Sequence, residues 1–160
     1  MKIGILSDTH DHLPNMRKAL EIFKQEGCQK ILHAGDIVSP FAVLLIREYK
    51  MPFTAVFGNN DGEWIALLKT AEGAGEIKKG PIELEWEGRK IALMHEPVYI
   101  EALKKSEYFD LIVYGHSHIP ELQTTRPLVI NPGECSGYLS GKPTTALCDL
   151  QNLSAKLITL

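Results

Sequence analysis

Short apolar runs alternate with amphipathic segments over the first third of the chain. Three of these runs have the length and composition of buried strands: residues 2–7, 30–34 and 52–57. After the first run, apolar residues recur at helical spacing from Met16 to Phe23, which predicts a helix over residues 13–26. Ser39 and Pro40 suit an N-cap and a first helical position, which predicts a second helix ending at residue 48. This order is typical of βαβ units with a parallel sheet.

The pattern becomes richer in strands in the rest of the chain. Residues 63–70 and 98–106 are expected to be helical, and residues 73–75 indicate a flexible, glycine-containing break. Glu87-Gly88-Arg89 separates two apolar runs and predicts a β-hairpin of residues 82–86 and 90–94. Four more short strands are expected: residues 111–114, 128–130, 145–150 and 156–159. Together these elements predict one domain, residues 1–160, that folds as an α/β four-layer α/β/β/α sandwich of two mixed β-sheets flanked by helices.

Composition and charge narrow the classes of function. The chain has 160 residues, of which 44% are hydrophobic and 23% charged, which suits one globular domain with a sizeable core. The net charge of -3 gives no support for binding extended nucleic acid, which needs basic surface. No apolar run is long enough to span a membrane, and the N-terminal run is too short for a signal peptide, so we expect a cytoplasmic protein. The three cysteines form neither a disulfide framework nor a CxxC zinc pattern.

Seven polar side chains follow apolar runs, nearly all at the expected exits of strands. They are Asp8, His10, Asp36, Asn59, His95, His116 and His118. Strand exits of an α/β sheet are where such folds bind ligands. Carboxylate, imidazole and amide oxygen ligands together suit divalent first-row metals, with manganese expected and nickel, iron, cobalt or zinc as alternatives. In an extended segment residues two apart point the same way, so we expect Asp8 and His10 to reach one site, and likewise His116 and His118.

The segments that contain these residues together resemble the calcineurin-like metallophosphoesterases, whose pattern is D-x-H, GD, GN, H and G-H-x-H. The matching segments are Asp8-Thr9-His10, Gly35-Asp36, Gly58-Asn59, His95 and Gly115-His116-Ser117-His118. The resemblance covers most of the chain, and the opening Asp8-Thr9-His10-Asp11-His12 is similar to that of the small single-domain phosphodiesterases of the YfcE type. It implies two divalent ions and a small phosphorylated substrate, a phosphodiester attacked by a metal-bridging hydroxide. It also implies how the ligands divide between the ions. The first ion would take Asp8, His10 and His118, the second Asn59, His95 and His116, and Asp36 would bridge them.

Two residues after the GN pair are candidates for catalytic roles. Asn60 stands where many members of the resembled family have a histidine, and its amide can contact a phosphate oxygen but cannot donate a proton as an acid. Asp61 either orients Asn60 or His10 or is an ordinary turn residue. Glu96 either places a negative charge beside the metals or is turned into solvent by Pro97.

Two alternatives to a phosphodiesterase stay open. One is a phosphomonoesterase acting on nucleotides, sugar phosphates or phosphoproteins. The other is a protein-binding scaffold, because a retromer subunit shares the expected fold and serves mainly as a binding platform. All seven candidate ligands are retained here, which favours the enzyme over the scaffold. The sequence leaves a homo-oligomer open, and it does not identify the natural substrate.

Overall fold

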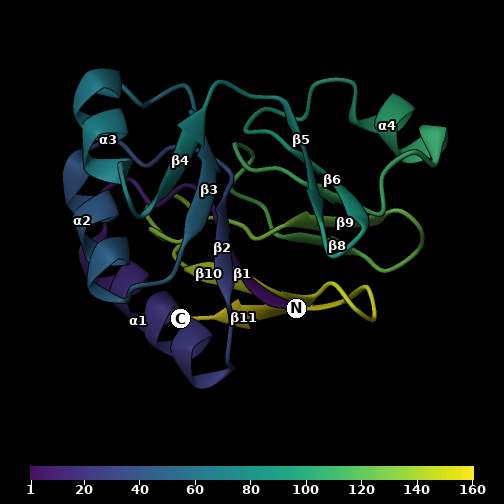
Figure 1. The fold of residues 1–160 in the computed structure, drawn as a ribbon, viewed down its shortest axis with the longest axis horizontal. Coiled ribbons are helices and arrows are strands. Elements are labelled where there is room, and N and C mark those ends of the chain that lie inside the picture. Colours follow the sequence, from purple (N-terminus) through teal and green to yellow (C-terminus); the bar gives the residue numbers. More distant parts are fainter.

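Two β-sheets lie face to face, with helices on both outer surfaces (Figure 1). The computed structural model describes residues 1–160. The larger sheet has six strands in the order β11-β10-β1-β2-β3-β4, and the smaller has five in the order β5-β6-β7-β9-β8. The strands of the larger sheet are β1 (Lys2–Leu6), β2 (Lys30–His33), β3 (Phe53–Val56), β4 (Gly75–Lys78), β10 (Thr144–Asp149) and β11 (Ser154–Thr159). Those of the smaller are β5 (Ile82–Trp86), β6 (Arg89–Leu93), β7 (Leu111–Val113), β8 (Glu121–Gln123) and β9 (Leu128–Asn131).

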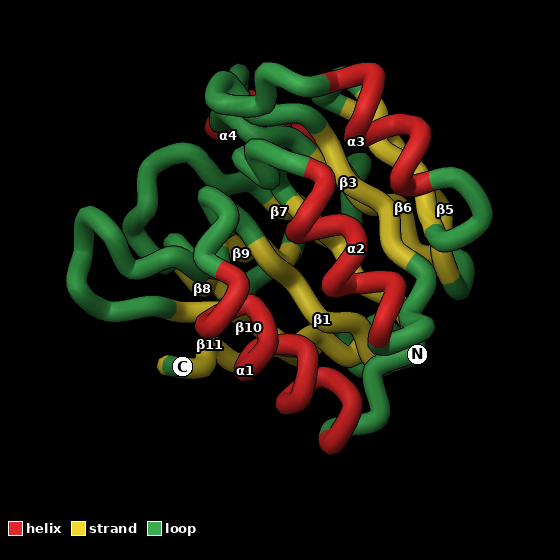
Figure 2. Tube along the Cα trace, turned by 90° about the vertical axis from the view of Figure 1, so that its left-hand side faces the viewer, coloured by secondary structure: helices red, strands yellow, loops and turns green.

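Three apolar layers hold the sandwich together. Helices α1 (Leu13–Gln25), α2 (Pro40–Glu48) and α3 (Trp64–Ala71) lie side by side over the outer face of the larger sheet (Figure 2). A second layer fills the space between the sheets, and a third lies beneath α4 (Ile100–Ser106). Successive residues of a strand face opposite ways, so Ile3 and Ile5 enter the layer between the sheets while Leu6 enters the helical layer. This confirms the predicted α/β/β/α sandwich.

Local sequence signals explain the helix boundaries. The side chain of Ser39 accepts a hydrogen bond from the amide of Phe41 at the start of α2, and Pro40 follows it, as predicted. Gly27 follows α1 with a φ of 74°, the left-handed conformation that commonly ends a helix. No helix of the chain combines the length and the hydropathy that a membrane crossing requires.

Two short strands are missing from the sequence-based prediction. Residues 73–75 were expected to be a flexible break, but Gly75 begins β4, which pairs in parallel with β3. Only Ile77 of β4 is buried, so the run has no apolar pattern to reveal it. The three-residue β8 was not predicted either, because its pairing with β9 at the edge of the smaller sheet leaves it only half buried.

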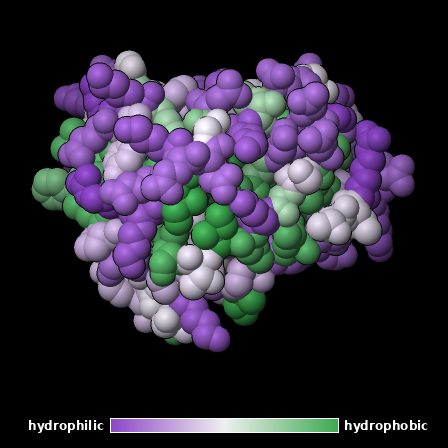
Figure 3. All heavy atoms as spheres, turned by 90° about the horizontal axis from the view of Figure 1, so that it is seen from below, coloured by the Kyte–Doolittle hydropathy of each residue, from purple (hydrophilic) through white to green (hydrophobic).

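The outer surface mixes polar and apolar residues. On the face seen from below, apolar side chains gather toward the middle, and polar side chains surround them (Figure 3). Apolar atoms contribute more than half of the surface of a typical folded protein, so this distribution by itself indicates no function.

Candidate metal centre

All seven candidate ligands lie in loops that follow parallel strands. Asp8 and His10 follow β1, Asp36 follows β2 and Asn59 follows β3 in the larger sheet. His95 follows β6, and His116 and His118 follow β7 in the smaller sheet. Parallel strands end at the same edge of their sheet, so the two sheets bring these loops to one end of the sandwich.

One group of ligand atoms forms around the buried carboxylate of Asp8. Asp8 Oδ1 lies 3.3 Å from His118 Nε2 and 3.9 Å from His10 Nε2, and His10 Nε2 lies 3.5 Å from Asp36 Oδ2. One ligand atom from each of these four residues lies within 4.8 Å of the others. Two carboxylates and two imidazoles converging in this way can hold one divalent ion.

A second group forms around the side-chain oxygen of Asn59. Its Oδ1 lies 2.8 Å from His95 Nε2 and 3.0 Å from His116 Nδ1. His95 Nε2 is also 3.5 Å from Asp36 Oδ1. The two oxygens of Asp36 therefore face different groups, Oδ2 toward His10 and Oδ1 toward His95.

The buried atoms of the first group fit a cation. Asp8 Oδ1 and His10 Nε2 are both buried, and neither has a hydrogen-bond partner. Burial is the main cause of a raised pKa at Asp8, although Ser7, which donates to Oδ2 at 2.5 Å, favours the charged form. An unpaired buried carboxylate is costly, and a bound divalent ion removes that cost. These carboxylate and imidazole side chains therefore suit a divalent first-row metal ion.

Hydrogen bonds on the outer side of two histidine rings fix which nitrogen faces the centre. His95 Nδ1 lies 2.8 Å from the carbonyl oxygen of Ala34, and His118 Nδ1 lies 2.9 Å from Glu134 Oε2. A carbonyl or an ionised carboxylate can only accept, so each Nδ1 carries the proton. In the neutral ring, Nε2 then carries no proton and its lone pair faces the centre, the arrangement common among metal-binding histidines.

Glu134 was missed as a functional residue by the sequence analysis. It is completely buried and also accepts hydrogen bonds from the backbone amides of Leu139 and Ser140 and from Ser136 Oγ. Burial opposes its ionisation, but the bonds from Ser140, His118 and Leu139 outweigh this and lower the pKa of Glu134 to about 2. A glutamate in a glycine-containing turn is usually exposed, so only its position next to His118 reveals its role.

The ligand-bearing loops are turns rather than extended segments. Asp8 and His10 have φ of 51° and 41°, and His116 and His118 have φ of 66° and 59°. Our expectation that alternation along an extended chain would aim these pairs is therefore wrong. Positive φ is unfavourable for residues with a side chain and gathers at functional sites, where the surrounding structure maintains it.

Two glycines beside the ligands are required by close approach. A Cβ on Gly58 would lie 2.2 Å from Asp36 Oδ1, and one on Gly115 would lie 1.9 Å from Ser7 Oγ. Neither has a positive φ. At both positions the lack of a side chain leaves room for Asp36 or Ser7 beside the ligands.

Asn60 contacts Asp36, one of the expected ligands. Its backbone amide donates to Asp36 Oδ1 at 2.9 Å, and its side-chain amide donates to Oδ2 at 2.7 Å. Burial opposes ionisation of Asp36, but the two bonds from Asn60, with the nearby rings of His95 and His10, give a net lowering of its pKa. Asn60 thus keeps the central carboxylate charged and oriented.

Asp61 lies beneath the loops and does not contact Asn60 or His10 through its carboxylate. It is only 5% exposed, and it accepts the amides of Val38 at 2.5 Å, Gly58 at 2.7 Å and Asp36 at 3.2 Å. Burial is the main cause of the raised pKa of Asp61. The carboxylate joins the loop after β2 to the loop after β3, which is a positioning contact rather than one with substrate.

Two polar residues of the α1 region have local structural roles. His12 caps α1 by accepting the amide of Asn15 at 3.2 Å, and Arg17 is an exposed helical residue paired with Glu48 at 3.2 Å. Glu96 is exposed, but it lines a cavity next to His95 and Asn59.

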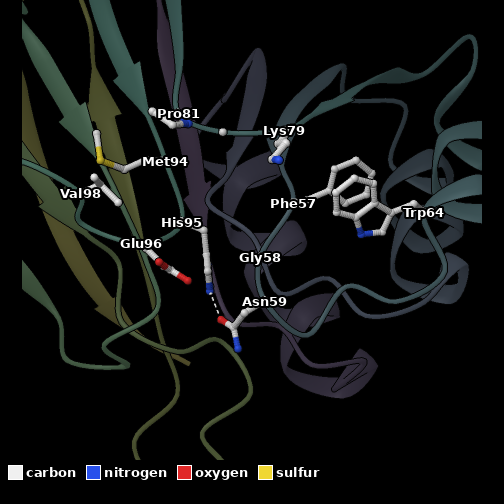
Figure 4. Close-up of a pocket in the computed structure, with 11 residues that line it drawn as sticks. Phe57, Gly58, Asn59, Trp64, Lys79, Pro81, Met94, His95, Glu96 and Val98 are labelled. Atoms are coloured by element: carbon white, nitrogen blue, oxygen red, sulfur yellow. Dashed lines mark hydrogen bonds between the residues drawn. The ribbon is translucent and has the colours of Figure 1, made fainter.

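That cavity has a volume of about 260 Å³ and opens beside the second group of ligands (Figure 4). Its apolar lining comes from Phe57, Trp64, Met94 and Val98. A separate hollow lies beside the first group. It is lined by His10, Val38, Asn60, His118, Tyr138 and Leu139. Each group of ligand atoms thus has a recess beside it.

Known proteins of similar sequence are named phosphodiesterases. The sequence model of the protein family described as the calcineurin-like phosphoesterase superfamily domain matches residues 1–153. Phosphodiesterase MJ0936 of Methanocaldococcus jannaschii is 40% identical, over 100% of this chain and 99% of that protein. Phosphodiesterase YfcE of Escherichia coli (strain K12) is 28% identical, over 91% of this chain and 85% of that protein.

Solved structures show the same fold. The structure of an archaeal phosphodiesterase, 40% identical, superposes with a TM-score of 0.88 and full coverage of both chains. Vacuolar protein sorting 29 from Cryptosporidium parvum has a TM-score of 0.71 at 18% identity, covering 99% of this chain and 96% of that chain. The second likeness concerns the fold alone.

Proposed function

Because this chain belongs to the calcineurin-like phosphoesterase superfamily, we propose that it is a metal-dependent phosphodiesterase with a dinuclear site centred on Asp36. The observation that carries the proposal is the position of the Asp36 carboxylate. Its Oδ2 lies 3.5 Å from His10 Nε2, and its Oδ1 lies 3.5 Å from His95 Nε2. A carboxylate between two groups of ligands is suited to bridging two ions.

The proposed ligands follow from the two groups of atoms. The first ion takes Asp8, His10, Asp36 and His118, and the second takes Asp36, Asn59, His95 and His116. Seven ligands exceed the need of one ion that must also keep an open position for substrate. Manganese is the expected metal, since the oxygen and imidazole donors suit divalent first-row ions.

The chain's own residues supply orientation and charge. When bound, two divalent ions would lower the pKa of a coordinated water and neutralise charge on the phosphoryl group. Glu134 and the carbonyl of Ala34 hold the rings of His118 and His95 with Nε2 toward the centre. Asn60 holds Asp36, and Asp61 joins the loops that carry Asp36 and Asn59. None of these residues is a free acid at the mouth of the site, so we expect the leaving group to depart without a proton from any of them.

The two recesses favour a diester over a monoester. One lies beside Asn59 and His95 and the other beside His10 and His118. A phosphoryl group held between them has room for an ester arm on each side, whereas a monoester would fill only one. The relatives MJ0936 and YfcE are both named phosphodiesterases, which supports the same substrate class for this chain.

Metal content and hydrolysis measured together test the proposal. We expect about two manganese ions per chain, and faster hydrolysis of bis(4-nitrophenyl) phosphate than of 4-nitrophenyl phosphate. Asp36→Asn should lose metal and activity together, by about 100-fold or more in kcat/KM, because one carboxylate serves both ions. Asp149→Asn, at the far strand end, is the matched control and should behave as wild type.

Two results would contradict the proposal. An Asp36→Asn protein that keeps both ions and near-normal turnover removes Asp36 from the bridge. A wild-type protein that holds two ions and hydrolyses neither substrate favours the binding-platform alternative.

A further inference from the structure

The cavity beside Asn59 and His95 has the features of a pocket for a flat ring. Phe57 and Trp64 are stacked, with ring centroids 4.3 Å apart and an interplanar angle of 9°. Trp64 is 42% exposed, and its Nε1 donates to the carbonyl oxygen of Asp61 at 2.5 Å. The indole is thus held in one orientation by Phe57 and Asp61 while part of its surface stays available.

An apolar wall faces these rings. Met94 and Val98 lie on the other side of the cavity from Phe57 and Trp64 (Figure 4). Met94 is buried, and Val98 is 43% exposed. Aromatic rings stack favourably on other rings, and the flexible, polarisable side chain of methionine contacts them well. Walls of this composition suit a planar ring better than a branched aliphatic group.

The charged groups at the rim are free to meet a ligand. Lys79 and Glu96 both line the cavity, Lys79 beside Phe57 and Glu96 beside His95 in the view of Figure 4, and neither forms an ion pair within the chain. One offers hydrogen-bond donors and the other acceptors. Lys79, which the sequence alone would leave in a solvated loop, therefore belongs to the lining of this cavity. The negative charge of Glu96 disfavours a second anionic group at this end.

From these features we infer that the cavity binds an uncharged aromatic arm of the phosphodiester substrate, an aryl or nucleobase-bearing group. The inference rests on the proposed function, because Asn59 and His95 belong both to the proposed second metal site and to the cavity lining. A volume of about 260 Å³ is smaller than the ~300–1,000 Å³ of pockets that enclose whole drug-sized ligands, so it suits one arm of a substrate. Trp64 is then the residue that sets the preference for a ring.

Binding of two non-hydrolysable anions tests the preference. Diphenylphosphinate and dibutylphosphinate carry the same charge, and their arms are attached through carbon, so neither is cleaved. Isothermal titration of the manganese-loaded full chain should give about tenfold tighter binding of the diphenyl ligand, the usual effect of stacking one ring on aromatic side chains. Trp64→Ala should abolish this ratio, and Trp64→Phe should retain most of it. Ile65→Ala is the control, since Ile65 is 74% exposed on the same helix and outside the cavity.

The outcomes separate this inference from the proposed function. If Trp64→Ala is unstable, Val98→Ala on the opposite wall replaces it and should lower the ratio about threefold. Equal binding of both phosphinates by the wild type, or a ratio unchanged in Trp64→Ala, overturns the aromatic pocket. Hydrolysis of bis(4-nitrophenyl) phosphate is measured on the same proteins. Hydrolysis without a ring preference refutes only the pocket, and a ring preference without hydrolysis refutes only the proposed activity.

Discussion

Replacing Glu134 by Gln should weaken metal binding through His118 rather than through any direct ligand. Glu134 is completely buried, and its Oε2 accepts the proton on His118 Nδ1 at 2.9 Å. Gln keeps the shape but removes the charge. Its single oxygen is also needed by the backbone amides of Leu139 and Ser140, so its NH2 group, which cannot accept a hydrogen bond, is left toward His118. The ring of His118 then loses its preferred tautomer and part of its basicity toward a metal.

The magnitude follows from one charge-assisted hydrogen bond. Such a bond contributes about 1.5–3 kcal/mol. Loss of the outer partner of a metal-binding histidine typically costs about 10–100-fold in affinity or activity, which corresponds to about 1.4–2.8 kcal/mol and agrees with that range. We therefore expect Glu134→Gln to raise the Kd of the first manganese ion, the one that His118 would hold, by about 10–100-fold.

Manganese affinity can be measured by competition with a fluorescent chelator, and kcat on bis(4-nitrophenyl) phosphate should recover partly at high manganese. Ser136→Ala is the matched control, because it removes another bond to Glu134 Oε2, of 3.1 Å, and leaves that of His118 in place. Its affinity should stay within about threefold of wild type, since a neutral hydrogen bond contributes only ~1 kcal/mol. A folded Glu134→Gln protein with wild-type affinity and turnover would refute the role of Glu134 in orienting His118.

Three further predictions follow from the site and the core. Gly58→Ala should lower metal content, measured by mass spectrometry, and hydrolytic activity by at least about tenfold, because its Cβ would lie 2.2 Å from Asp36 Oδ1. Metal content and activity at the wild-type level would contradict the close packing. A plot of log kcat/KM against leaving-group pKa for substituted phenyl diesters should be steep, because Asn60 cannot act as an acid, and a flat plot would reveal an acid elsewhere. The folded chain should not react with a thiol reagent at pH 8 and should expose three thiols in denaturant. Burial raises the pKa of Cys28 to about 11 and those of Cys135 and Cys148 to about 12, so the reactive thiolate form is scarce at pH 8. Rapid labelling of the folded chain would contradict this prediction.

The sequence determined the chemistry of the site because ligand types are a local property. Polar residues placed directly after apolar runs predicted where strands end, and parallel strands bring their ends together. Asp8, Asp36 and His95 are therefore identifiable as candidate ligands from the sequence alone. The long helices and central strands were predictable for the same reason, since their apolar spacing is written along the chain.

The tertiary structure decided the features that depend on residues far apart in the chain. His118 and Glu134 are 16 positions apart and meet only because the loops after β7 and β9 end at the same edge. Positive φ at Asp8 and His118 is imposed by the surrounding packing and cannot be predicted from residue type alone. The aromatic cavity combines Phe57, Trp64 and Met94 from separate elements, so no local pattern could indicate it. Burial and proximity depend on the three-dimensional structure, and they alone identify the turn residue Glu134 and the exposed Trp64 as candidate functional residues.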